Sequence, residues 1–377
     1  MDGLRGVAMI AVFFFHFSAL WLSLPASRPA ALFLGFVRAN GGIGTDFFML
    51  LSGLFAYNAR MKAKKGFPEF LSGRIRRIYP LYFLICFFYV EASLLAPELS
   101  HLPPHPAAAV LYIVESFLML PPLFGQHPIY DPTWTLSYII LFYFIAEAVA
   151  RLFRGTGLSR RWRIILLCCA ALAWAAVGER TALWPARTVE FWLGMALSEA
   201  IGSVQEHGRS WRNAALALAI PSVVFCSGLW LISTFGGPSR VSLLFPIDRL
   251  VSVPAGLLSF TVVAFFGPEW WKTALSCKYL RFLGAISYPY YMTHGFTVKL
   301  FHCIILPWLG AAASSPVCFW TSQAAGLMMS VVVALLVHIC LDKQLVMQLR
   351  GGFATAPDCA SCPRFVCAGR STCAGAA

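Results

Sequence analysis

Apolar residues run along this chain in long, nearly uncharged stretches, and shorter segments rich in Lys, Arg, Gly and Pro separate them. A helix needs about twenty mostly apolar residues to cross the hydrocarbon core of a bilayer. On that criterion the pattern predicts an all-α membrane protein with about ten transmembrane helices. The predicted spans are residues 5–24, 43–59, 78–97, 133–150, 164–178, 187–204, 214–235, 249–267, 282–308 and 319–341.

A further apolar stretch, residues 107–125, is weaker than the others. Glu115 interrupts it, and Pro121 and Pro122 end it. We expect a short interfacial or re-entrant helix in an outer loop. No internal repeat or clear linker divides the chain, so residues 1–345 are expected to form one membrane domain. Residues 346–377, rich in Cys, Ala and Gly, are expected to form a cytoplasmic tail without stable structure.

Composition supports a membrane protein, because 59% of the residues are apolar and only 12% are charged, about half the charged share of soluble domains. The mean hydropathy is +0.72. No basic leader precedes the first apolar run, so we expect that span to stay in the mature protein.

Basic residues orient the predicted helices. Residues 78–150 contain no Lys or Arg, whereas the segment just before them is crowded with both: Arg60, Lys62, Lys64, Lys65, Arg74, Arg76 and Arg77. The positive-inside rule makes this basic segment cytoplasmic, and an even number of spans then places both termini in the cytoplasm. The connections at residues 151–163, 205–213 and 268–281 fall on the same side. Basic loops facing anionic lipid account for the net charge of +13, so no nucleic-acid partner is expected.

Four of the twelve cysteines stand in the tail, at Cys359, Cys362, Cys367 and Cys373. Their spacing superficially resembles a metal knuckle, but it lacks a second C-x-x-C pair and any histidine. We favour reduced thiols in a cytoplasmic tail, and we expect no metal.

Two ionisable side chains stand in the first predicted span. Arg5 is followed by ten residues and then by His16. At about 100° and 1.5 Å per residue, the two side chains return to nearly the same face, roughly 16 Å apart. Ionisable groups inside a membrane helix are costly and point to function. The alternatives are an interfacial anchor for Arg5 and a core histidine, hydrogen-bonded to a neighbouring span, for His16.

Further polar and aromatic motifs stand near the ends of predicted spans. They are Gly44-Thr45-Asp46-Phe47-Phe48 with Leu51-Ser52-Gly53, Arg74-Ile75-Arg76-Arg77-Ile78-Tyr79-Pro80-Leu81-Tyr82, Trp134-Thr135-Leu136-Ser137 with Phe142-Tyr143, and Ser287-Tyr288-Pro289-Tyr290-Tyr291-Met292-Thr293-His294. Together with Asp2-Gly3-Leu4-Arg5-Gly6 and His16, these motifs make the chain resemble the acyltransferase-3 family of integral-membrane acyltransferases. The resemblance extends to about Asp342.

The resemblance implies transfer of an acyl group, usually acetyl, from acyl-coenzyme A to a hydroxyl of a glycan, a lipid-linked sugar or another large acceptor. It also implies a bacterial protein, which we place in the cytoplasmic (inner) membrane. In the family the Arg-x10-His pair is functionally essential. Carried over to this chain, His16 would be the catalytic base and Arg5 would help to hold the donor.

The chemistry of the residues agrees with these roles. A sugar hydroxyl is a poor nucleophile, and a neutral imidazole that takes its proton accelerates attack by about 10²–10⁴-fold. Histidine suits this task because its ordinary pKa lies near neutrality. Coenzyme A carries phosphates, which a guanidinium binds in a bidentate manner. No metal is required.

The basic motif before the third predicted span has two interpretations. Arg74, Arg76 and Arg77 either only set the topology or, with Tyr79, form a cradle for the phosphates of coenzyme A. Both remain open at this point.

The remaining candidates are placed on the acceptor side: Asp46, Ser52, Trp134, Ser137, Tyr288 and His294. Asp46 either lies in an acceptor vestibule or pairs with another polar group. His294 binds the acceptor, lines the donor tunnel or is a hydrogen-bonded structural histidine. Arg187 and Glu190 are weaker candidates, because at this spacing they could simply pair with each other.

One position departs from the family pattern. Ile139 stands where the family commonly has a glutamate, so we expect altered acceptor preference or reduced activity. The family's Glu-Lys-Pro near the end is also replaced, by Leu341-Asp342-Lys343-Gln344. Two other functions remain open. One is a transporter or flippase of a lipid-linked sugar, with His16 as a proton relay; the other is a catalytically inactive membrane protein.

Overall fold

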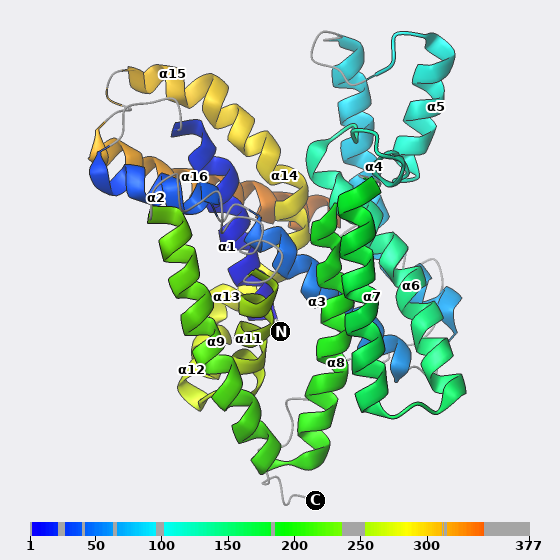
Figure 1. Ribbon diagram of the computed structural model, residues 1–377. Coiled ribbons are helices and arrows are strands. Elements are labelled where there is room, and N and C mark those ends of the chain that lie inside the picture. Colours follow the sequence, from blue (N-terminus) through cyan, green and yellow to red (C-terminus); the bar gives the residue numbers. More distant parts are fainter. Residues whose placement is uncertain are drawn as a thin grey trace, which may run out of the picture.

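The computed structural model describes residues 2–21, 27–39, 42–62, 66–95, 102–181, 185–235, 253–310, 312 and 315–342. Every regular element within these ranges is a helix, as Figure 1 shows. The prediction of an all-α chain is therefore confirmed for them. The tail predicted at residues 346–377 lies outside the described residues, so its separation from a membrane domain stays a prediction.

Each of the ten predicted spans overlaps a helix. The helices concerned are α1 (Asp2–Ser18), α3 (Ile43–Met61), α4 (Phe67–Leu95), α6 (Trp134–Thr156), α7 (Arg160–Thr181), α8 (Val189–His207), α9 (Arg209–Phe235), α11 (Val253–Phe266), α14 (Ser287–Leu300) and α16 (Pro316–Val337).

Within the described ranges, five helical segments are long and apolar enough to cross a membrane. They are Asp2–Trp21, Phe67–Leu95, Asp131–Thr156, Arg160–Gly178 and Pro316–Cys340. A sixth span results if α11 and the short α12 (Glu269–Leu275), bent by 109°, are counted together. These segments are consistent with an integral, multi-pass membrane protein. Some other helices carry buried carboxylates, such as Glu190 and Glu199 in α8, which lower their hydropathy. Ten spans and cytoplasmic termini stay predictions.

Three short helices, α2, α5 and α13, differ from or refine the spans predicted from the sequence. Helix α2 (Arg28–Ala39) was not predicted, because its apolar run is short and begins with Arg28 and Pro29. The weak stretch at residues 107–125 forms α5 (Pro106–Phe117) and a 3₁₀ turn over Pro121–Phe124. The long span predicted at residues 282–308 is interrupted, since α13 (Lys278–Ala285) ends before α14 begins.

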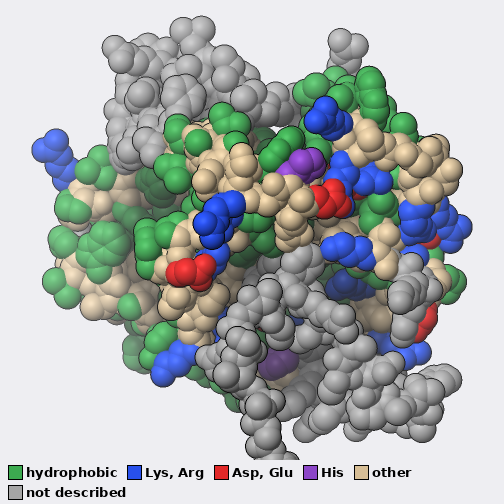
Figure 2. All heavy atoms as spheres, turned by 90° about the horizontal axis from the view of Figure 1, so that it is seen from below, with side chains coloured by type: hydrophobic (Ala, Val, Ile, Leu, Met, Phe, Trp, Pro, Cys, Tyr) green, Lys and Arg blue, Asp and Glu red, His purple; other side chains and the backbone are tan. Residues whose placement is uncertain are grey.

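Basic side chains gather at one end of the molecule. The connection from α6 to α7, the turn between α8 and α9, and helix α12 all lie at the bottom of Figure 1. Figure 2 shows this end from below, with many Lys and Arg side chains and fewer acidic ones. The positive-inside rule predicts a common location for these connections.

Glycines allow the helices around the site to approach closely. A Cβ atom built on Gly53 of α3 would lie 2.2 Å from the Phe191 carbonyl oxygen of α8, and one on Gly194 of α8 would lie 2.1 Å from the Leu50 oxygen. Without such small residues the backbones could not approach to this distance, and membrane helices commonly use them at their interfaces. The α3–α8 pair therefore depends on both glycines.

We expect Gly53→Ala to destabilise the protein by about 1–3 kcal/mol, the usual cost of overpacking. Gly73→Ala in α4 is the matched control, because nothing lies within 4 Å of a Cβ at Gly73. Thermal unfolding of purified protein in detergent, monitored by size-exclusion chromatography, gives the melting temperature of each variant. Equal melting temperatures for the two variants would contradict the close α3–α8 contact.

Helix α1 lies in the middle of the assembly (Figure 1) and packs against α3, α13, α14 and α16. At its N-terminal end, a Cβ on Gly284 of α13 would lie 1.8 Å from the Asp2 carbonyl oxygen. This packing places α1 among four other helices, with Arg5 and His16 both half-buried.

Candidate active site

Two adjoining pockets lie along α1, one near Arg5 and one at His16. The first, the arginine pocket, contains Arg5, Arg74 and Arg77 and encloses about 810 Å³ of space, including part that is open to solvent. The second, the histidine pocket, contains His16 and encloses about 1200 Å³ on the same measure. Thr45 and Tyr291 line both pockets. The two residues that the sequence placed on one helix face thus serve neighbouring pockets.

Three guanidinium groups meet in the arginine pocket. Arg5 interacts electrostatically with Arg74 and Arg77, and the exposed Asp2 carboxylate lies 3.5 Å from the Arg5 guanidinium. Like charges brought together in a partly dehydrated pocket repel one another. A bound polyanion would relieve this repulsion, which makes the pocket suited to phosphate groups.

Aromatic rings position these cations. The Arg5 guanidinium lies over the Phe55 ring at 5.6 Å, and the Arg74 guanidinium lies 5.2 Å from the Phe70 ring and 5.8 Å from that of Tyr143. Tyr143 also lines the pocket. Such cation–π contacts stabilise a charge without neutralising it, so the guanidinium groups keep their capacity to bind an anion.

The structure separates the arginines that the sequence grouped together. Arg74 and Arg77 are three residues apart on α4 and share a face, and both line the arginine pocket. Arg76 lies on a different face of α4 and lines neither pocket, although Arg76 and Arg77 are both exposed. Tyr79 also stays outside the two pockets, where its ring packs edge-on against Tyr82 at 5.9 Å.

Hydrogen bonds fix the wall between the pockets. The Tyr291 hydroxyl donates to the Pro132 carbonyl oxygen at 2.5 Å and lies 2.7 Å from the Thr135 hydroxyl. The Tyr288 hydroxyl donates to the Ile78 carbonyl oxygen and so links α14 to α4. Tyr288 and Ser52 line the arginine pocket, as does Ile139.

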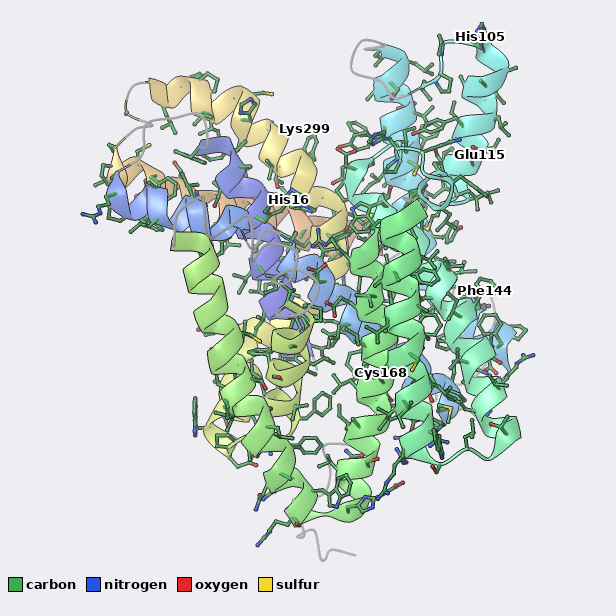
Figure 3. The ribbon with its side chains drawn as sticks, in the orientation of Figure 1. His16, His105, Glu115, Phe144, Cys168 and Lys299 are labelled. Atoms are coloured by element: carbon green, nitrogen blue, oxygen red, sulfur yellow. The ribbon has the colours of Figure 1, made fainter. Side chains whose placement is uncertain are left out.

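His16 lies at the opposite end of α1 from Arg5, where Figure 3 labels it. Its half-buried ring lines the histidine pocket and contacts Phe15, with a centroid separation of 4.9 Å. Within the described part of the chain the ring forms no hydrogen bond, although Asp131 of the same pocket interacts with it electrostatically. This arrangement differs from that of a hydrogen-bonded core histidine and leaves the imidazole available to a ligand.

The histidine pocket combines aromatic and polar groups. Trp134 and Tyr138 line it, with ring centroids 6.1 Å apart, and so do Asp131, Gln126 and His127. Pockets for small molecules characteristically combine such apolar surfaces with a few polar groups that fix orientation. The predicted candidate Ser137, one turn along α6 from Trp134, is buried and lines neither pocket.

Asp46 forms an ion pair across two helices. Its carboxylate accepts a hydrogen bond from Arg187 Nε at 2.8 Å. The sequence left open whether Asp46 lies in an acceptor vestibule or pairs with another polar group, and in the structure it pairs with Arg187. Arg187 does not form its ion pair with Glu190, which is buried nearby in α8 with one oxygen unpartnered among the described residues.

We expect Asp46→Asn to lower the stability by about 1–3 kcal/mol, because a largely buried charge-assisted hydrogen bond is lost. Glu269→Gln is the matched control, since Glu269 pairs with Lys272 at the same distance of 2.8 Å but is 87% exposed. Exposed pairs contribute little. Thermal unfolding compares the two variants, and a larger loss in Glu269→Gln would contradict this assignment.

Several lining residues were not singled out as site candidates from the sequence. Thr45 and Tyr291 belong to motifs that were recognised, but nothing in a linear pattern shows that they meet between two pockets. Asp131 stands three residues before Trp134, and this closeness to the motif was the available signal. Among the described residues, no group of three or more His, Cys, Asp and Glu side chains is placed to hold a metal ion.

Comparisons with known proteins identify a family and two related sequences. A family model described as an acyltransferase domain matches residues 1–339. Acyltransferase MdmB of Streptomyces mycarofaciens is 27% identical over 398 aligned residues, covering 95% of this chain and 94% of MdmB. Exopolysaccharide production protein ExoZ of Rhizobium meliloti is 24% identical over 322 residues, covering 84% of this chain and 93% of ExoZ. No solved structure matches the chain.

Proposed function

Because this chain belongs to the acyltransferase-3 family of membrane acyltransferases, we propose that it transfers an acyl group, acetyl in the simplest case, from acyl-coenzyme A to a hydroxyl of a glycan or a lipid-linked sugar. One observation carries the proposal. A pocket with three guanidinium groups and a pocket with an available imidazole adjoin at Thr45 and Tyr291. Such a pair of pockets suits a polyanionic donor and a hydroxyl acceptor that react where they meet.

Arg5, Arg74 and Arg77 are the groups we assign to the phosphates of the donor. A guanidinium binds phosphate in a bidentate manner, and three of them match a molecule that carries a pyrophosphate and a further phosphate. The remaining wall of the arginine pocket is largely apolar, with Leu136 and Ile139 among its residues. The uncharged arm and the acyl group of the donor would lie against this wall.

His16 is the group we assign as general base. Its neutral imidazole takes the proton of the acceptor hydroxyl while the oxygen attacks the thioester carbonyl carbon. The new carbon–oxygen bond forms, the carbon–sulfur bond breaks, and coenzyme A leaves as a thiolate. The imidazolium then returns the proton to that sulfur, so His16 is neutral again at the end of each cycle.

The acceptor would occupy the histidine pocket. Trp134 and Tyr138 offer aromatic faces, and Asp131 and Gln126 offer polar groups for sugar hydroxyls. The name of ExoZ refers to exopolysaccharide production, which favours a glycan as the class of acceptor. We place the arginine pocket toward the cytoplasm of a bacterial cell, where acyl-coenzyme A is made.

Ile139 stands where the family commonly has a glutamate, and its position in the structure bears on whether the chain is an inactive relative. Ile139 lines the arginine pocket and not the histidine pocket. Its apolar side chain therefore removes no group from the immediate surroundings of His16. This placement favours an altered donor pocket over loss of the base.

Membranes that contain the protein, supplied with [¹⁴C]acetyl-coenzyme A, test the proposal. We expect label in the extractable glycan or lipid fraction, compared with membranes that lack the protein, and we expect no effect when the proton gradient is collapsed. Transport of a lipid-linked sugar that needs no acyl-coenzyme A and stops without the gradient would instead identify a transporter.

A further inference from the structure

We infer that His294 of α14 holds the His16 imidazole in a single tautomer and orientation, as a positioning residue for the base. The inference rests on the proposed function of His16. The two rings lie on neighbouring helices, α1 and α14, with centroids 4.9 Å apart and planes tilted by 55°. His294 is only 1% exposed and lines neither the arginine pocket nor the histidine pocket, so direct binding of the acceptor does not suit it.

The protonation pattern of His294 follows from its backbone contact. Its Nδ1 atom lies 2.8 Å from the carbonyl oxygen of Tyr291. A carbonyl oxygen can only accept, so Nδ1 carries the hydrogen. In the neutral imidazole the other nitrogen, Nε2, then has a lone pair and acts as an acceptor.

This acceptor is the unexplained group at the site. The Nε2 atom is buried and has no hydrogen-bond partner among the described residues. Buried polar atoms are normally satisfied, so Nε2 calls for a donor. The nitrogen atoms lie on the rims of both rings, and a centroid separation of 4.9 Å lets a small rotation of His16 bring one of its N–H groups within hydrogen-bonding distance.

Packing makes His294 the rigid member of the pair. Its ring stacks on Tyr290, with a centroid separation of 5.5 Å and an angle of 13°, and also contacts Tyr291 at 5.6 Å. The next residue, Gly295, leaves room for the Tyr130 hydroxyl, which a Cβ would approach to 2.8 Å. His16, in contrast, is half-buried at the pocket. The less constrained ring would therefore adjust to the more constrained one.

The consequence concerns the second nitrogen of His16. If one ring nitrogen donates to His294 Nε2, the other carries the lone pair and faces the acceptor hydroxyl. A carboxylate fulfils this task in catalytic triads, but a neutral imidazole does so without a further charge inside the membrane. Asp131 lines the same pocket as His16 and acts on it electrostatically, whereas the buried His294 lines neither pocket.

Three variants and one spectroscopic measurement test this inference. Purified full-length His16→Ala, His294→Leu and His294→Gln are assayed with acetyl-coenzyme A and the labelled fraction identified above. We expect His294→Leu to lower kcat by about 10²-fold or more with both KM values unchanged. His294→Gln, whose amide oxygen can accept at a similar position, should retain activity within about tenfold of wild type.

The second measurement needs no substitution at His294. Solid-state NMR of the ¹⁵N-histidine-labelled wild-type protein in lipid should show one tautomer of His16 and a through-hydrogen-bond contact to His294 Nε2. The His16 signals are assigned from their absence in His16→Ala. Two tautomers of His16 in the wild type, or a His294→Leu variant with wild-type kcat, would overturn the inference. Activity that persists in His16→Ala would overturn the proposed function itself.

Discussion

Replacing His16 with alanine is expected to lower the kcat of acyl transfer by about 10²–10⁴-fold, the usual contribution of a positioned general base. The KM for acyl-coenzyme A should stay within about twofold of wild type, because the groups assigned to the donor line a different pocket from His16. Steady-state kinetics of purified protein with labelled acetyl-coenzyme A measures both quantities.

His302→Ala is the matched control for this variant. His302 is an exposed histidine in the π-helical turn Phe301–Ile305 and lines neither pocket. The His302→Ala variant should keep full activity, so a loss of kcat in His16→Ala can be attributed to the position of His16 and not to the loss of a histidine as such. A His16→Ala protein that elutes as a folded monodisperse species and keeps wild-type kcat would remove His16 from the mechanism.

Arg77→Ala is expected to have the second large effect, this time on the donor. A hydrogen bond to a charged group contributes about 1.5–3 kcal/mol, so the KM for acyl-coenzyme A should rise by roughly 10–100-fold. The effect on kcat should be much smaller. Kinetics at several donor concentrations separates the two quantities, and added salt should weaken donor binding to the wild type more than to the variant.

Arg76→Ala provides a control on the adjacent position. Arg76 carries the same charge on the same helix and is exposed, as Arg77 is, but it lines neither pocket. Its replacement should therefore change the KM for the donor by less than about threefold, as expected for an exposed charge outside the site. If Arg76→Ala and Arg77→Ala raise the KM equally, general positive charge and not the arginine pocket attracts the donor.

The helices could be predicted from apolar runs, because each run is long enough to require regular hydrogen bonding in a membrane. The predicted helices differ from the observed ones where an apolar run is short or is interrupted. Helix α2 was missed, and the predicted segment 282–308 is divided between α13 and α14 and continues into the π turn Phe301–Ile305. Periodicity alone does not show such interruptions, because the tertiary packing decides them.

Within the site, spacing along one helix was informative and relations between helices were not. The distance from Arg5 to His16 could be anticipated from helix geometry, and the structure assigns the two residues to adjoining pockets. The partner of Asp46 could not be anticipated, since Arg187 lies 141 residues further along the chain. His294 was recognised as a candidate, but its closeness to the His16 ring appears only when α1 and α14 pack together.

The arginine positions illustrate the same limit on a smaller scale. Arg74, Arg76 and Arg77 are equivalent as charges in a sequence, and only the helix face distinguishes them. Arg74 and Arg77 share the face toward Arg5, whereas Arg76 does not. The direction of a helix face can be calculated from sequence, but which face meets the pocket follows from the packing of α4 against its neighbours.

The most direct test of the central claim is a single-turnover experiment with purified wild-type protein and limiting [¹⁴C]acetyl-coenzyme A, with the identified acceptor present. We predict that label lost from the thioester is recovered in full as a base-labile oxygen ester on the acceptor, with one free coenzyme A thiol released for each ester formed. Label that stays in the thioester, or that is released as free acetate whether or not the acceptor is present, would contradict direct transfer between the two pockets.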